Sequence, residues 1–116
     1  MHNEIERILK TVTLGDKTVP SAHILYTGKS PLYIVYSILS EDPAVCADDV
    51  AETSVVEIDV DIYAKILSNL TGTINSVKAK FIAAGWTWVE DGPEIFDDDT
   101  GYIHITITFE KERTIS

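Results

Sequence analysis

The sequence predicts an α+β fold in which a mainly antiparallel β-sheet carries two helices packed on one face. Residues 53–63 and 102–113 alternate apolar and polar side chains, which is typical of strands with one buried and one wet face. Two other segments repeat apolar residues at helical spacing. The predicted order is α-β-β-β-α-β-β, and such runs of adjacent strands favour antiparallel pairing over a parallel doubly wound sheet.

The chain is expected to form a single domain over residues 1–116. At 116 residues, with 45% hydrophobic residues, it is long enough to bury a core without a disulfide or a metal ion. Its lone cysteine, Cys46, cannot form an internal disulfide, and the sequence has no cluster of Cys and His ligands. We therefore expect no metal site and no cofactor.

The N-terminal segment predicts a short amphipathic helix. Asn3 is the expected N-cap, and an apolar stripe continues until the helix ends near Thr13. The stripe consists of Ile5, Ile8, Leu9 and Val12. A turn over residues 14–17 follows, and residues 23–26 and 33–39 are the next predicted strands.

The acidic segment 41–52 contains Pro43 and has no regular period, so it is expected to be a loop or an extended hairpin tip. Beyond the alternating strand 53–63, an apolar stripe predicts a helix over residues 70–84. Gly85 is placed to cap that helix at its C-terminus. Strands over residues 86–90 and 102–113 complete the prediction.

The charge of the chain is strongly acidic and unevenly distributed. The net charge is −10, and no basic residue lies between Lys29 and Lys65, where eight acidic residues occur. Six more acidic residues lie between Glu90 and Asp99. Phosphate backbones are bound by clustered Lys and Arg, so stable binding of nucleic acid is not expected.

The sequence also predicts a protein that is not a membrane protein. No apolar run approaches the roughly 20 residues that a helix needs to cross a bilayer. The first residues lack the basic start and the apolar stretch of a secretory signal. A cytosolic protein is therefore expected.

Three carboxylates on the predicted strand 53–63 could in principle converge on a divalent cation. Glu57, Asp59 and Asp61 share one face, and His104 lies on the polar face of another strand. Neighbouring side chains on one strand face are about 7 Å apart, and no lysine accompanies them. A solvated face is the preferred interpretation, and we expect the protein not to be an enzyme.

The run Asp97-Asp98-Asp99-Thr100-Gly101 does not match a calcium loop. An EF-hand needs Gly at its sixth position and Glu at its twelfth, but counting from Asp97 these are Tyr102 and Thr108. A turn in which aspartate side chains bond local amides, ending on a glycine, is the better prediction. Trp86 and Trp88 are expected either to fill the core against a helix or to form a protein interface.

The order of several segments resembles a known family. The segments are Pro31-Leu32-Tyr33-Ile34-Val35-Tyr36, the strand Val56-Glu57-Ile58-Asp59-Val60-Asp61-Ile62-Tyr63, the helix end Ala84-Gly85-Trp86, and Asp98 to His104 leading into Phe109-Glu110-Lys111-Glu112-Arg113. Together they are similar to the small tail-completion or tail-terminator proteins of long-tailed phages and prophages, including tail-to-head joining proteins. Residues 41–52 match no motif of that family.

The resemblance implies a structural protein. Such proteins form a ring, usually a hexamer, that caps the tail tube, stops its growth and contacts the head connector. The implied partners are copies of this chain, a tail tube protein and a head connector protein, in the host cytoplasm during assembly and then in the virion tail. DNA would pass an acidic ring without sticking to it.

The candidate interface residues lie in the second half of the chain. They are Trp86, Trp88, Asp97, Asp98, Asp99, Tyr102 and His104. An alternative hypothesis is an acidic DNA mimic that inhibits a DNA-binding enzyme, because fourteen carboxylates lie in the two acidic stretches. A third and weaker hypothesis is a metal-dependent enzyme that uses Asp59, Asp61 and His104.

Overall fold

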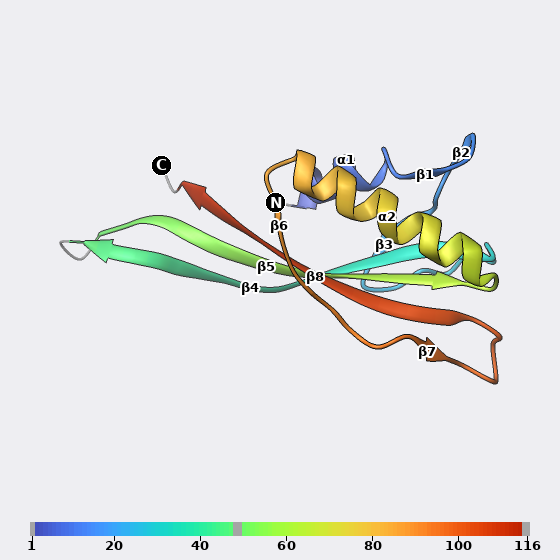
Figure 1. Cartoon of the computed structure of the whole chain (residues 1–116). Coiled ribbons are helices and arrows are strands. Elements are labelled where there is room, and N and C mark those ends of the chain that lie inside the picture. Colours follow the sequence, from blue (N-terminus) through green and yellow to red (C-terminus); the bar gives the residue numbers. More distant parts are fainter. Residues whose placement is uncertain (1, 48–49, 115–116) are drawn as a thin grey trace.

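The protein consists of one twisted β-sheet with two helices on one of its faces (Figure 1). This computed structural model describes the backbone of residues 2–47 and 50–114 and the side chains of residues 2–40 and 54–112. The elements are α1 (His2–Leu9), β1 (Thr13–Leu14), β2 (Lys17–Thr18), β3 (Ser21–His23), β4 (Leu32–Ala47), β5 (Val50–Ala64), α2 (Leu67–Ala83), β6 (Thr87–Asp91), β7 (Ile95–Phe96) and β8 (Ile103–Thr114).

The main sheet has the strand order β3-β4-β5-β8-β6, and β7 also pairs with β8. Every pairing in it is antiparallel except that of β3 with β4, which is parallel. The predicted α+β fold with a mainly antiparallel sheet is therefore confirmed. Strands β1 and β2 form a separate small hairpin around the predicted turn.

The first helix is shorter and begins earlier than predicted. It starts at His2, so Asn3 lies within its first turn and is not the N-cap. It ends at Leu9 rather than near Thr13, because the next turn tightens: the amide of Val12 donates to the carbonyl of Leu9 at 3.1 Å. The carbonyl of Val12 then accepts a bond from Val19, which draws the chain into the β1–β2 hairpin.

The acidic segment 41–52 belongs to a long hairpin, which decides between the two predictions for it. Strand β4 continues to Ala47, and β5 begins at Val50, with antiparallel partners from Leu32↔Ala64 to Ala47↔Val50. Three register shifts interrupt the pairing, between Ile38 and Ser40, Pro43 and Val45, and Val45 and Cys46. The side chain of Cys46 lies outside the described residues.

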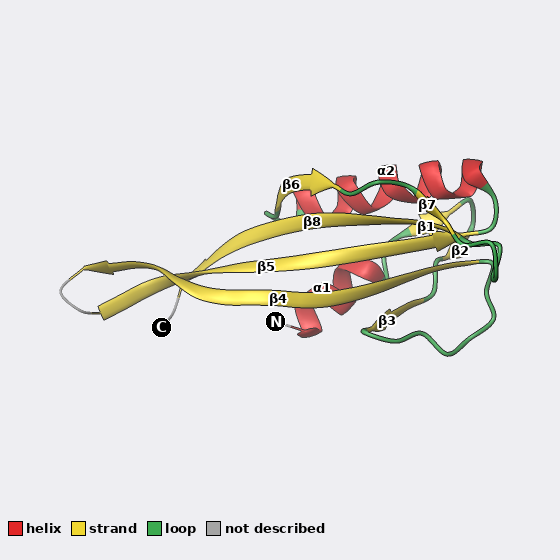
Figure 2. Ribbon diagram, turned by 90° about the horizontal axis from the view of Figure 1, so that it is seen from below, coloured by secondary structure: helices red, strands yellow, loops and turns green. Residues whose placement is uncertain are grey.

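The end of this hairpin projects beyond the helices together with the end of β8 (Figures 1 and 2). We call this projection the arm; its described part is residues 41–47, 50–55 and 112–114. It makes the molecule elongated, with principal extents of 52 × 28 × 23 Å. Within the described residues, β4 has only β5 as a neighbour from Ser37 onward, because β3 pairs with residues 34–36 alone.

The second helix begins three residues before the predicted start. The amides of Asn69 and Leu70 both bond to the carbonyl of Ile66, so the polar pair Ser68-Asn69 lies in the first turn rather than before it. Its C-terminus confirms the predicted cap at Gly85, whose φ is +95°. A glycine there avoids the steric cost that a side chain would have in this left-handed conformation.

The core lies between the two helices and the face of the sheet that they cover. Its largest fully buried side chains include Ile5 and Leu9 of α1, Leu70 and Phe81 of α2, and Phe109 of β8. The sheet contributes the alternate residues of its central strands, which are Ile34, Tyr36, Val56, Ile58, Val60, Ile62, Ala64, Ile105, Ile107 and Phe109. The alternation predicted for residues 53–63 is thus confirmed from Val56 onward.

Candidate functional site

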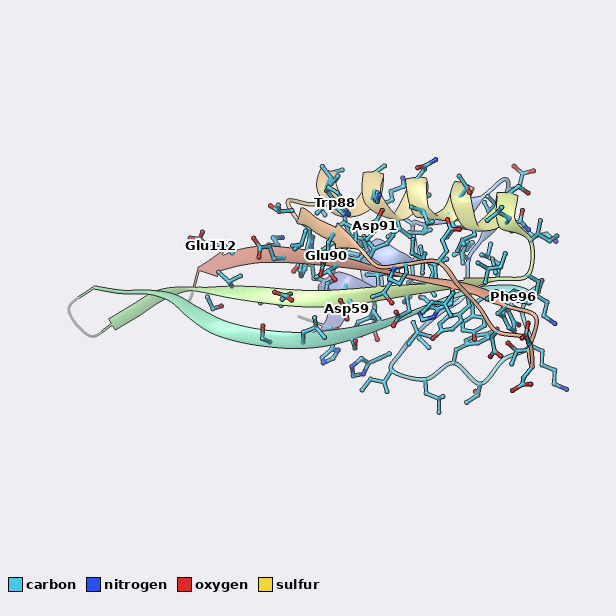
Figure 3. The ribbon with its side chains drawn as sticks, turned by 60° about the horizontal axis from the view of Figure 1, so that its bottom comes forward. Asp59, Trp88, Glu90, Asp91, Phe96 and Glu112 are labelled. Atoms are coloured by element: carbon cyan, nitrogen blue, oxygen red, sulfur yellow. The ribbon has the colours of Figure 1, made fainter. Side chains whose placement is uncertain are left out.

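The polar positions of the same strands form the uncovered side of the sheet, which we call the open face. Strand register places these residues in rows across β4, β5 and β8. The rows are Tyr33–Tyr63–His104, Val35–Asp61–Thr106, Ser37–Asp59–Thr108 and Ser40–Glu57–Glu110. The open face is therefore aromatic at one end and acidic toward the arm (Figure 3).

The aromatic end is a continuous stack of rings. Tyr33 and Tyr63 stack with centroids 4.7 Å apart, and Tyr63 stacks on His104 at 4.4 Å with an interplanar angle of 3°. Tyr26, from the loop after β3, extends the stack by packing on Tyr33 at 4.4 Å. Such stacking follows from the direct cross-strand pairing, which brings opposite side chains within contact distance.

Tyr102 packs against this stack nearly at right angles. Its ring lies 5.3 Å from that of Tyr33 and 6.4 Å from that of Tyr63, and its hydroxyl donates to the carbonyl of Ser30 at 2.6 Å. The bond ties the loop before β4 to the start of β8. Burial raises the pKa of Tyr33, with smaller contributions from the neighbouring tyrosines, so its phenol stays protonated above its usual range.

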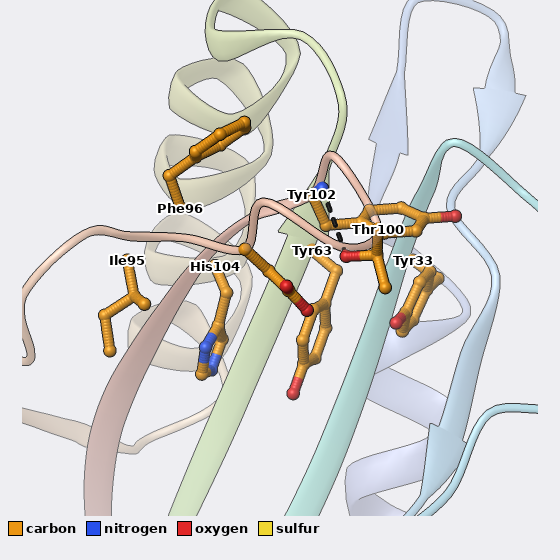
Figure 4. A pocket seen from close by; sticks show the side chains of 8 residues that line it. Tyr33, Tyr63, Ile95, Phe96, Thr100, Tyr102 and His104 are labelled. Carbon is orange, nitrogen blue, oxygen red and sulfur yellow. Dashed lines mark hydrogen bonds between the residues drawn. The ribbon is translucent and has the colours of Figure 1, made fainter.

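These rings line a pocket of about 480 Å³, within the size range of ligand sites (Figure 4). Strand β7 closes one side, since Ile95 is the register partner of His104. The pocket is lined by Tyr33, Tyr63, Ile95, Phe96, Asp97, Thr100, Tyr102 and His104. Ile95 and Phe96 are 50% and 60% exposed, so their side chains are accessible to a binding partner.

The acidic loop forms one edge of the pocket and is a tight turn. Its ends meet where the amide of Asp97 donates to the carbonyl of Tyr102 at 2.9 Å, and the amide of Asp99 bonds to the carboxylate of Asp97 at 3.0 Å. Gly101, with φ +79°, closes the turn. This is the local aspartate–amide turn that the sequence predicts.

Next to the pocket, the carboxylate of Asp61 holds His104 and Thr106. Its Oδ1 lies 3.2 Å from Nε2 of His104, and it also accepts a bond from the hydroxyl of Thr106. Nε2 of His104 therefore faces both the carboxylate of Asp61 and the hydroxyl of Thr106, and it lies 3.3 Å from that hydroxyl oxygen. A relay for nucleophilic catalysis needs the carboxylate on the opposite nitrogen, so this arrangement lacks that geometry.

Asp59, on the next row, accepts a bond from the hydroxyl of Thr108 at 2.7 Å. Asp59 and Asp61 are therefore each engaged by a threonine of β8 rather than directed at a common point. Among the described side chains, no group of three or more His, Cys, Asp or Glu residues is placed to hold a metal ion. The carboxylates predicted to share a strand face do share it, along the open face.

The two tryptophans are placed differently. Trp86 is 2% exposed, because its amide bonds to the carbonyl of Phe81 at 3.0 Å and its ring packs against Phe81 in the capping turn after α2. Trp88 is 46% exposed at the sheet edge, where its Nε1 donates to Asp91 at 2.9 Å. Only Trp88 of this pair presents a surface to a partner.

The structure brings Asp97, Tyr102 and His104 together at the pocket, whereas Asp98 and Asp99 lie in the adjoining turn outside its lining. Sequence analysis does not identify Tyr33, Tyr63, Ile95 and Phe96 as site residues. The sequence feature that points to this site is the position of Tyr63 and His104 on the predicted polar faces of their strands. The register that places them side by side depends on which strands are neighbours.

No protein-family model matches this sequence, and comparison with curated proteins gives no match. Within the described residues, neither helix is both long and apolar enough to span a bilayer.

Proposed function

We propose that this chain is a structural subunit of a phage or prophage tail, which assembles as a ring that caps the tail tube and helps to join tail to head. The sequence resemblance to tail-completion proteins supports the proposal. The observation that carries it is the arm, a sheet extension beyond the core that exposes strand edges. An unpaired strand edge is a template for pairing with another chain.

A ring requires two different surfaces on each subunit, because the contact runs head to tail. The sheet offers them, since one edge is β4 from Ser37 onward and the opposite edge is made by β6 and the end of β8. The three register shifts in the β4–β5 pairing change the local twist of the β4 edge. Such irregularities hinder pairing with an unmatched strand, which opposes open aggregation.

The electrostatics of the open face fit the same proposal. Its acidic rows carry Glu57, Asp59 and Glu110, and a ring lined by such rows would repel the DNA that passes through it. Glu57 and Glu110 are direct cross-strand partners, a pairing of like charges that costs stability in the isolated subunit. Each subunit would contribute its net charge of −10 to the assembled ring.

The test is the oligomeric state of the purified chain, alone and with tail tubes from a phage that encodes it. We expect light scattering to show a closed oligomer, or a monomer that forms rings on tube ends in electron micrographs. The position of the gene between head-connector and tail-tube genes would support the proposal. Monomers that neither oligomerise nor bind tube ends would contradict it.

A second candidate function is that of an acidic inhibitor which mimics DNA. The acidic rows of the open face favour it, together with the exposed Glu90 and Glu112. However, Asp59 and Asp61 are bonded to threonines of the same sheet, which reduces their availability to a basic enzyme. Salt-sensitive inhibition of a DNA-binding enzyme at low ionic strength would support this candidate, and its absence would exclude it.

A further inference from the structure

Two of the three histidines of the chain lie side by side where the first helix meets the edge of the sheet. His2 begins α1 and His23 ends β3, and the centroids of their rings are 4.4 Å apart with an interplanar angle of 68°. Both side chains are exposed. The sequence gives no sign of this pair, because the two residues come from different elements that the fold brings together.

Tyr36 of β4, the register partner of His23, determines which nitrogen of His2 carries a proton. Its hydroxyl lies 3.0 Å from Nδ1 of His2 and donates to Oε1 of Glu6 at 3.2 Å. The carboxylate only accepts bonds, so the single hydroxyl proton is directed to Glu6 and Nδ1 of His2 must be the donor to the tyrosine oxygen. In the neutral imidazole this tautomer leaves a lone pair on Nε2.

The bond from His2 to Tyr36 is of the kind that metal-binding histidines make with their second nitrogen. Such a bond fixes the tautomer and the orientation of the ring, and it makes the other nitrogen a better ligand. Behind the tyrosine hydroxyl, the carboxylate of Glu6 extends the chain of hydrogen bonds. His2 is therefore prepared to bind an ion through Nε2, beside the ring of His23.

Two imidazoles select a class of ion. Imidazole nitrogen suits zinc, copper and nickel ions, whereas magnesium and calcium prefer oxygen ligands. A zinc ion lies about 2.0–2.1 Å from each imidazole nitrogen, so two nitrogens on one ion are at most about 4 Å apart. Rings with centroids 4.4 Å apart reach such a separation by rotation of the exposed His23 ring about its side-chain bonds.

We propose that His2 and His23 together bind a zinc ion, through Nε2 of His2 and one ring nitrogen of His23. Water completes the coordination, because among the described residues no group of three or more His, Cys, Asp or Glu side chains is placed around one ion. The bound ion links the start of α1 to the edge strand β3. The inference does not depend on the proposed function, because it stands or fails with this cluster alone.

The experiment is an NMR titration of the full chain with zinc chloride near neutral pH, followed through the ring signals of the three histidines. We expect saturable shifts of His2 and His23 with one equivalent of zinc, and no such shift of His104. Magnesium chloride at the same concentrations should shift neither ring. Acidification to about pH 5 should release the zinc, because it binds only neutral imidazole.

Three variants test the assigned ligands against a matched control. His2→Gln and His23→Gln each remove one ligand at an exposed position and should weaken zinc binding at least about tenfold. His104→Gln is the control, since this histidine lies on the open face beside Asp61, and it should change binding less than about twofold. Tyr36→Phe keeps both ligands and should weaken binding about tenfold. Nitrogen chemical shifts of His2 should show that the Nδ1–H tautomer is less populated in this variant.

Three results would overturn the inference. These are the absence of saturable shifts with zinc, a shift confined to one of the two histidines, and a His104→Gln variant that loses as much affinity as His23→Gln. Zinc binding and a His2 tautomer that do not change in Tyr36→Phe would overturn the role assigned to Tyr36. Unchanged dispersion of the amide signals in each variant shows that a loss of binding is measured on a folded protein.

Discussion

At the scale of single residues, Ile24 has an unfavourable backbone conformation. Its φ is +68°, and it is the one described non-glycine residue with positive φ. The conformation follows from a tight turn after β3, in which the amide of Leu25 donates to the carbonyl of His23 at 2.7 Å. For a β-branched residue this left-handed conformation costs about 1–2 kcal/mol.

Ile24→Asn should therefore stabilise the protein by about 1 kcal/mol, because asparagine tolerates this conformation and Ile24 is 67% exposed. Urea unfolding measures the change. Leu25→Asn is the control, since Leu25 is 70% exposed and has no positive φ. A gain of equal size in both variants would show that the removal of exposed apolar surface, and not backbone strain, is responsible.

Tyr36 makes stability depend on pH in the alkaline range. Burial raises its pKa to about 12, with a further contribution from the carboxylate of Glu6, which accepts a bond from the tyrosine hydroxyl at 3.2 Å. The unfolded chain releases this proton near pH 10, whereas the folded protein retains it. The contribution of Tyr36 to the free energy of unfolding is therefore fully present below pH 10, and it is lost as the pH rises from 10 to about 12.

In Tyr36→Phe we expect a loss of about 1 kcal/mol at neutral pH, because the hydroxyl bond to Glu6 is removed. Between pH 10 and 12 the unfolding free energy of the wild type should fall more steeply than that of the variant, by about 1 kcal/mol per pH unit. Urea unfolding at each pH measures both curves. Parallel curves through this range would rule out the assigned role of Tyr36.

At the scale of elements, α2 begins without a capping side chain. Ile66 occupies the N-cap position with φ −121° and ψ 123°, the extended conformation that N-cap residues adopt, but its side chain cannot accept a bond. Ile66 is 56% exposed, so little apolar burial is lost when it is replaced.

Ile66→Ser should stabilise the protein by about 1 kcal/mol, because serine accepts a bond from a free amide of the first turn. Thermal unfolding measures the gain. Ile82→Ser, at a position 54% exposed in the last turns of the same helix, removes a similar side chain where no free amide is available and should give no gain. A gain in the control that matches Ile66→Ser would contradict the capping argument.

Much of the element pattern follows from the sequence, because local chemistry determines it. The alternation through Ile58 and Ile62 identifies β5, and Gly85 marks the end of α2 through the conformation that its position requires. The parallel pairing of β3 and the short strand β7 could not be predicted, because two or three residues carry no periodic signal. Their pairing depends on the neighbouring strands.

The site is less predictable than the fold. The acidic turn follows from its aspartates and glycine, and the core position of Trp86 is one of the two that its sequence context predicts. The pocket could not be derived, because it requires the register that sets Tyr33 beside Tyr63 and Tyr63 beside His104. A residue's face can be predicted from its own strand, but its neighbours on that face cannot.

At the scale of the whole molecule, we expect the arm to be needed for assembly but not for folding. The described core begins at Val56 on β5, and the arm projects beyond the helices that cover it (Figure 1). Asp42 and Val55 are direct partners on adjacent strands, so a two-residue Asn-Gly turn can replace residues 43–54 between them.

This shortened chain should unfold cooperatively at a temperature within a few degrees of the wild type, yet fail to form rings. Thermal unfolding and light scattering measure the two properties on the same sample. Rings formed as readily by this shortened chain would show that the subunit contacts do not require residues 43–54.

The most direct test of the proposed assembly role is the growth of tail tubes in the presence of the purified chain. We predict that added protein stops elongation, binds one end of each tube as a ring and leaves the tube wall free in electron micrographs. Tubes that continue to grow at saturating protein, with no density added at either end, would contradict the account.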